Sequence, residues 1–181
     1  PGGEAVATVQ TRHPTPREGG WTCRMELASP AKVPPGTMGM WDLPAVRIRG
    51  TRVASRACDD LVGVACVLSA IERLLQAGGA IRVLGLLTRA EEVGALGAAE
   101  AGRRRVSPAD ALVVGLETSK AQPAAPLGGG AVIRVGDRVR TFDADVTACM
   151  TATARELAKR DTGLKYVRQL MPGGMCESTL Y

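Results

Sequence analysis

Carboxylates stand beside three apolar segments of this chain, where they could bind metal ions. They are Asp59, Asp60, Glu91, Glu92 and Glu117. The first two precede a long apolar run, and the others follow two further runs, at 81–87 and 111–116. Gathered in one crevice, these groups would repel one another unless cations lay between them. Two divalent metals about 3.5–4 Å apart would offset the repulsion and activate a water molecule for hydrolysis.

The adjacent residues Glu91 and Glu92 could take two different catalytic roles. On irregular backbone, neighbouring side chains point in different directions, so one could ligate a metal while the other holds the attacking water as a general base. Each motif alone has a plainer interpretation. An Asp-Asp pair before a helix usually caps it, and a Glu-Glu pair before a helix usually belongs to its first turn. The order of the three motifs, each beside an apolar run, favours the metal site.

The elements that must position these residues can be read from Asp60 onward. Helices are expected at 61–76, 94–103 and 142–160, and strands at 81–87, 111–116, 131–135 and 164–170. The first helix has one broad apolar stripe, whereas 81–87 and 111–116 are nearly all apolar, as strands buried on both faces are. This alternation predicts an α/β fold with a mostly parallel sheet and helices on both faces. Ligands bind such sheets beyond the carboxyl ends of their strands, where the glutamates would lie.

The first third of the chain has a different pattern. Residues 1–54 are rich in proline and glycine, with short strands expected at 5–9, 21–27 and 46–48 and a turn at 34–36. We therefore expect two regions, a β-rich segment at 1–54 and an α/β domain at 55–181.

Composition argues against a membrane or nucleic-acid partner. Hydrophobic residues make up 45% of the 181 residues and charged residues 23%, which is typical of a globular protein. No apolar run approaches the roughly 20 residues that span a bilayer. The basic run 103–105 could contact phosphates or complement the dipole at a helix end. The second interpretation is favoured because aromatic residues, at 3%, do not interleave with the basic ones.

The cysteines indicate a reducing compartment, and hence a cytoplasmic protein. There are five, widely spaced and without a CxxC pair. An odd number of dispersed cysteines favours free thiols over disulfides or a zinc-thiolate site.

Four features together resemble the cocatalytic zinc aminopeptidases, in particular their glutamyl-aminopeptidase or TET-type branch. These are 57–63 (ACDDLVG), 88–94 (TRAEEVG), Glu117 and 128–137 (GGGAVIRVGD). The Asp-Asp and Glu-Glu motifs are typical of the whole zinc-peptidase clan, and the GGG…VGD stretch indicates this branch. The resemblance extends from about residue 34 to the end. It implies a three-layer αβα sandwich with a mixed, mostly parallel sheet, and makes residues 1–54 part of a small β-rich inserted lid domain.

The resemblance also implies roles for the acidic residues. Asp59 would bridge two divalent metal ions, zinc or cobalt, and its peptide bond to Asp60 would be cis. Glu91 would be the general base, while Glu92 and Glu117 would each ligate one metal. The family usually has aspartate at the position of Glu117, so this chain carries a longer carboxylate there.

A loop near the C-terminal end resembles a substrate-contacting loop of the family. Gly173, Gly174 and Glu177 match a Gly-Gly-Thr-Asp-Ala-like pattern, with methionine for threonine and glutamate for aspartate. The family further requires two histidines, but this chain has a single one, His13, which we expect to be an exposed loop residue. We therefore expect the family histidines to lie outside the chain, which would then be an interior fragment of a longer enzyme.

These features predict a metal-dependent aminopeptidase that acts on peptides and assembles as a homo-oligomer. Two alternatives remain open. A carboxypeptidase or N-deacylase of the same clan usually has a dimerisation insert after the Glu-Glu motif, whereas the apparent insert here precedes Asp59. A non-catalytic remnant of the fold is supported only by the missing histidines.

Overall fold

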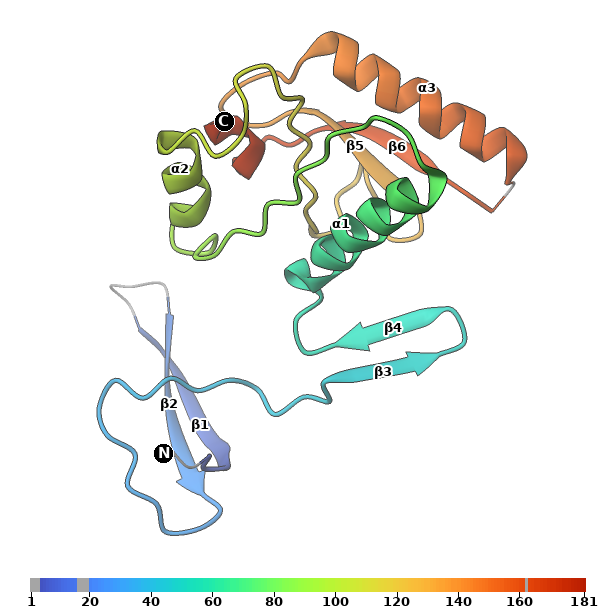
Figure 1. The fold of residues 1–181 in the computed structure, drawn as a ribbon. Coiled ribbons are helices and arrows are strands. Elements are labelled where there is room, and N and C mark those ends of the chain that lie inside the picture. The colour runs from blue at the N-terminus through green and yellow to red at the C-terminus, as the bar shows by residue number, and fades with distance from the viewer. Residues whose placement is uncertain (1–3, 16–19, 162) are drawn as a thin grey trace. The chain divides into compact units, whose positions relative to one another are not determined.

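The computed structural model describes residues 4–15, 20–161 and 163–181, and the chain divides into two compact units (Figure 1). Unit 1 is Pro1–Arg56 and unit 2 is Ala57–Tyr181. In the described part of the chain, no helix combines the length and apolar character that crossing a membrane requires.

Unit 1 consists of two antiparallel hairpins. Strand β1 (Ala7–Thr15) pairs with β2 (Gly20–Leu27), and β3 (Val46–Arg49) pairs with β4 (Arg52–Ser55). The guanidinium of Arg12 lies 4.9 Å from the ring centre of Trp21, which covers one aromatic face with a cation.

The prediction that His13 lies in a loop is wrong, although its predicted exposure is confirmed. His13 pairs with Thr22 and Pro14 with Trp21, so β1 extends through the proline. A two-stranded hairpin has only edge strands, and these tolerate proline because one side of each strand needs no hydrogen-bonding partner.

Unit 2 combines helices with one pair of parallel strands (Figure 1). Its elements are α1 (Cys58–Ala77), α2 (Leu96–Arg103), β5 (Ala131–Gly136), α3 (Ala144–Arg160), β6 (Tyr166–Leu170) and the 3₁₀ helix η1 (Glu177–Leu180). Helix α3 connects the parallel strands and packs against β5, which makes β5–α3–β6 a βαβ unit. The 3₁₀ helix packs against α2.

All three predicted helices are present, and their ends follow from local chemistry. Asp143 begins α3 by accepting a hydrogen bond from the amide of Val146 at 2.9 Å. Gly78 ends α1 with a positive φ of 68°. Arg103 and Arg104 both pair with Glu100 at 2.6 Å near the end of α2, which confirms the helix-end interpretation of the basic run.

The predicted strands at 81–87 and 111–116 are wrong. Both segments lack strand pairing, and their side chains are largely exposed, with Leu84 at 57% and Leu112 at 69%. A strand requires a neighbour that satisfies its backbone groups, and no described strand pairs with either segment. The sheets are consequently small, two antiparallel and one parallel, so the mixed α/β class stands but a mostly parallel sheet is not formed by the described residues.

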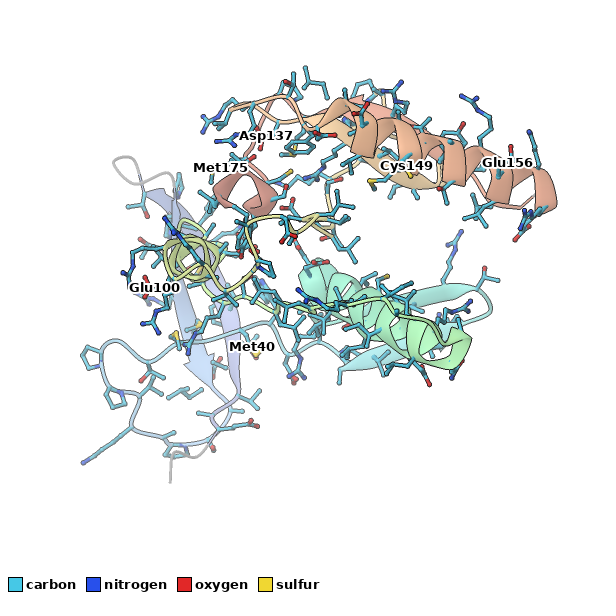
Figure 2. All side chains as sticks on the ribbon, turned by 45° about the horizontal axis from the view of Figure 1, so that its top comes forward. Met40, Glu100, Asp137, Cys149, Glu156 and Met175 are labelled. Carbon is cyan, nitrogen blue, oxygen red and sulfur yellow. The ribbon has the colours of Figure 1, made fainter. Side chains whose placement is uncertain are left out.

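Asp137, at the end of the GGG…VGD stretch, fastens the C-terminal segment to β5. Its Oδ1 accepts from the amides of Val139 at 2.7 Å and Arg140 at 2.9 Å. Its Oδ2 accepts from the amide of Cys176 at 2.9 Å and the hydroxyl of Thr179 at 2.7 Å. Burial alone would raise the pKa of the Asp137 carboxyl. The four hydrogen bonds outweigh this effect and hold the pKa far below its ordinary 3.8. Figure 2 shows Asp137 beside Met175, where the chain leads into η1.

Replacing Asp137 by asparagine should destabilise the protein, because an amide nitrogen cannot accept the hydrogen bonds now made by one carboxylate oxygen. We expect the free energy of unfolding in urea to fall by about 1–3 kcal/mol. Asp143→Asn is the matched control, since asparagine caps a helix as well as aspartate does. A loss no greater than that of the control would contradict the role of Asp137.

The same substitution has a predictable pH dependence. A carboxyl whose pKa is lowered by folding stabilises the protein above its unfolded pKa, and this stabilisation is lost as the pH falls. The difference in unfolding free energy between wild type and Asp137→Asn should thus be complete above pH 3.8 and shrink below it. A difference that is constant through the acid range would contradict a charged Asp137.

Candidate functional site

One cavity of unit 2 brings the predicted site residues together. It measures about 1480 Å³ and is walled by α1, by the segments 82–92 and 107–118, and by the start and end of the C-terminal 3₁₀ segment. Its acidic lining residues are Asp59, Asp60, Glu91, Glu92, Asp110, Glu117 and Glu177. Gly173 and Gly174 do not line it.

Asp59 and Asp60 lie at the distorted start of α1. The peptide bond between them is cis, as the sequence resemblance implied, and both residues depart from helical geometry. Asp60 Oδ1 accepts a hydrogen bond from the amide of Gly63 at 3.0 Å. This approach is so close that a Cβ on Gly63 would collide with the Asp60 carboxylate. The capping interpretation therefore applies to Asp60, while Asp59 precedes it at the cavity wall.

Glu91 and Glu92 occupy a tight turn before α2. The carbonyl of Glu91 accepts from the amides of Gly94 at 3.0 Å and Ala95 at 2.8 Å. Because α2 begins only at Leu96, the interpretation of this pair as part of a helix's first turn is wrong. Ala90 and Ala95 have positive φ values of 62° and 52°, a conformation that costs a non-glycine residue about 1 kcal/mol or more. The fold maintains this turn despite that cost.

The Glu117 carboxylate is held at both oxygens. Arg134 Nη1 donates to Oε2 at 2.6 Å, and the amide of Glu177 donates to Oε1 at 3.0 Å. The same Arg134 nitrogen lies 2.9 Å from Cys176 Sγ. Sequence reasoning missed Arg134, although it is the single charged residue of the otherwise apolar strand β5, which was the available signal.

Glu177 reaches the cavity from the C-terminal segment. Its Oε2 accepts from the hydroxyl of Thr88 at 2.6 Å. Its Oε1 is buried and has no hydrogen-bonding partner among the described residues, and the same is true of the Tyr181 hydroxyl. Burial, and then the Glu177 charge, raise the pKa of the Tyr181 phenol. A buried carboxylate oxygen without a donor is costly, so a hydrogen-bond donor or a cation placed beside Glu177 Oε1 would stabilise the protein.

Neighbouring acidic side chains act on Glu91 at the cavity. Partial removal of water raises the pKa of the Glu91 carboxyl, and the negative charges of Glu92, Glu117, Glu177 and Asp59 raise it further. Glu91 is nevertheless exposed by area, so water can reach its carboxyl. These residues, Asp59, Glu91, Glu92, Glu117 and Glu177, come from four distant parts of the sequence and are here called the carboxylate cluster.

The cluster suits a divalent cation in its chemistry. Carboxylate oxygens are ligands that such cations accept, and both the raised pKa of Glu91 and the unpaired oxygen of Glu177 indicate negative charge that a cation would neutralise. No three possible ligands among the described residues are gathered closely enough to hold an ion. The donors thus fit a metal by type, and their side chains would have to move toward one another to coordinate it.

One family model matches the chain. It is described as M42 glutamyl aminopeptidase and matches residues 22–179, a range that includes every residue of the carboxylate cluster. The predicted family is therefore confirmed. No curated protein and no solved structure matches the chain.

The carboxylate cluster makes a prediction about stability without metal. Glu177→Gln removes one of several like charges, and we expect it to raise the free energy of unfolding by on the order of 1 kcal/mol. Glu117→Gln should have the opposite effect, because it breaks a half-buried ion pair with Arg134.

Urea unfolding in the presence of a chelator measures both variants. Glu156→Gln is the control, since its ion pair with Lys159 is exposed and contributes little. Equal destabilisation by the Glu177 and Glu117 substitutions would contradict a repulsive cluster.

Proposed function

Because this chain belongs to the M42 glutamyl aminopeptidase family, and is therefore a peptide hydrolase, we propose that it removes N-terminal residues from peptides with a metal-activated water. The observation that carries the proposal is the carboxylate cluster, in which partial burial and then four neighbouring acids raise the pKa of Glu91. M42 peptidases are metal-dependent, and the cluster supplies ligands of the required type.

We assign the metal-binding role to Asp59, Glu92 and Glu117. Asp59 would bind two divalent ions, zinc or cobalt. Glu92 would ligate one of these ions and Glu117 the other. When bound, such ions polarise the scissile carbonyl and lower the pKa of a water molecule. Support for two ions comes from the family resemblance and from the number of like charges that face one cavity.

We assign the general-base role to Glu91. Its carboxylate would take a proton from the attacking water and then pass that proton to the departing amine. A raised pKa favours this task, because a base is most effective when its pKa lies near the operating pH. Exposure of Glu91 at the cavity gives water access to it.

The C-terminal loop is proposed to contact the substrate. Glu177 lines the cavity and keeps one buried oxygen available for a donor. Gly173 and Gly174 would shape the loop, and the carbonyl of Gly174 is held by the amide of Arg138 at 3.0 Å.

The finer architecture is also proposed from the family. Unit 2 would form part of a three-layer αβα sandwich, for which the βαβ unit β5–α3–β6 provides support. Residues 1–54, which contain nearly all of the two hairpins, would belong to a small β-rich inserted lid domain. A homo-oligomer and a cytoplasmic location are further expectations, the latter supported by five free cysteines.

The test of the function uses protein made from the complete reading frame and loaded with zinc or cobalt. Hydrolysis of one short peptide with a free N-terminus should be compared with hydrolysis of the same peptide after N-acetylation. Metal-dependent cleavage of only the free peptide is the expected result. Cleavage of only the acetylated peptide would assign the protein to the carboxypeptidase or deacylase branch, and cleavage of neither would favour a non-catalytic protein.

Two variants separate the roles within the site. Glu91→Gln should retain metal and lose about 10²–10⁴-fold in kcat, the usual contribution of a general base. Asp59→Asn should lose metal as well as activity, which calorimetry and metal analysis would detect. Glu156→Gln, on the exposed face of α3, is the control and should retain both. Full activity of Glu91→Gln would refute the assignment of the base.

A further inference from the structure

The ion pair between Arg134 and Glu117 differs from the other ion pairs of the described chain. Its side chains are only 12% and 25% exposed, whereas those of the pairs at Glu100 and Glu156 are 44–69% exposed. A pair whose side chains are mostly covered is less disturbed by solvent than a surface pair, and truncating one partner leaves the other charge uncompensated. The proposed mechanism uses Glu117 but gives no role to Arg134.

The two donors to Glu117 restrict how its carboxylate can turn. Arg134 holds Oε2 and the amide of Glu177 holds Oε1. A carboxylate offers about four lone-pair sites on its two oxygens, so each oxygen retains capacity for a further partner. The carboxylate is thus oriented and still able to bind a cation.

Arg134 is itself fixed by its surroundings. It lies in β5 opposite Gln169 of the parallel strand β6, and its Nη1 also reaches Cys176 Sγ at 2.9 Å. The backbone of Cys176 is in turn bound by Asp137 at 2.9 Å. Arg134, Cys176 and Asp137 therefore form a connected hydrogen-bonded support behind Glu117.

We propose that Arg134 is a positioning residue that orients the Glu117 carboxylate for its metal ion. This inference rests on the proposed role of Glu117 as a ligand. The guanidinium charge opposes a nearby cation, but four other carboxylates influence the same region. Removal of Arg134 would therefore lower the metal affinity by freeing Glu117 more than it would raise that affinity by removing one positive charge. Outer-shell partners of this kind typically contribute 10–100-fold to metal affinity.

The experiment measures zinc affinity by calorimetry on the full protein. Arg134→Met should bind zinc 10–100-fold more weakly than wild type, while Arg134→Lys, which keeps a donor and a charge, should recover part of the loss. Arg103→Met is the matched control, because it removes an arginine from an ion pair of the same 2.6 Å length on the surface. Its affinity should equal that of wild type.

A double-mutant cycle distinguishes positioning from general destabilisation. If Arg134 acts through Glu117, then Arg134→Met should add little to the loss already caused by Glu117→Gln. Far-UV circular dichroism at the measuring temperature verifies that each variant is folded. If Arg134→Met does not fold, the cycle is measured with Arg134→Lys in its place. Additive losses, unchanged affinity or tighter binding in the Arg134 variants would overturn the role of Arg134 alone. Absence of zinc binding by wild type would overturn the proposed function together with it.

Discussion

Repulsion among carboxylates around one cavity is the constraint on which the rest of unit 2 depends. Partial burial and four neighbouring acids raise the pKa of Glu91, and Glu177 keeps a buried oxygen without a donor. Folding ordinarily disperses like charges, so a cluster maintained in this way requires compensation. Arg134 supplies part of the positive charge that offsets these carboxylates, and a divalent cation would provide the remainder.

The scaffold meets this constraint by fastening the acidic segments to a single strand. Arg134 and Asp137 both belong to or directly follow β5, and one binds Glu117 while the other binds the backbone and hydroxyl of the segment 176–179. Glu117 and Glu177, which lie 60 residues apart in the sequence, are joined by a hydrogen bond as a result. The GGG…VGD stretch thus has a physical function here, since it supplies the anchor for two sides of the cavity.

Local chemistry was predictable from the sequence, and long-range pairing was not. All three predicted helices are present, and local chemistry at Asp143 and Gly78 accounts for one end of α3 and one end of α1. The apolar runs 81–87 and 111–116 predict strands, but an apolar run does not specify a partner, and neither segment has one among the described residues. Residue types and motif order identified the acids of the cavity. A lone charge in an apolar strand marks Arg134, but its contact with Glu117 is created only by the folded chain.

The most direct test of this account is the titration of the Glu91 carboxyl itself. Carbon-13 NMR of labelled glutamate side chains would follow it through the acid range, with Glu91→Gln used to assign its signal. For the metal-free protein, we expect a midpoint above the ordinary 4.5 of glutamate and a decrease of that midpoint when zinc binds. A midpoint at 4.5 that zinc does not change would contradict a cluster of mutually repelling, cation-binding carboxylates.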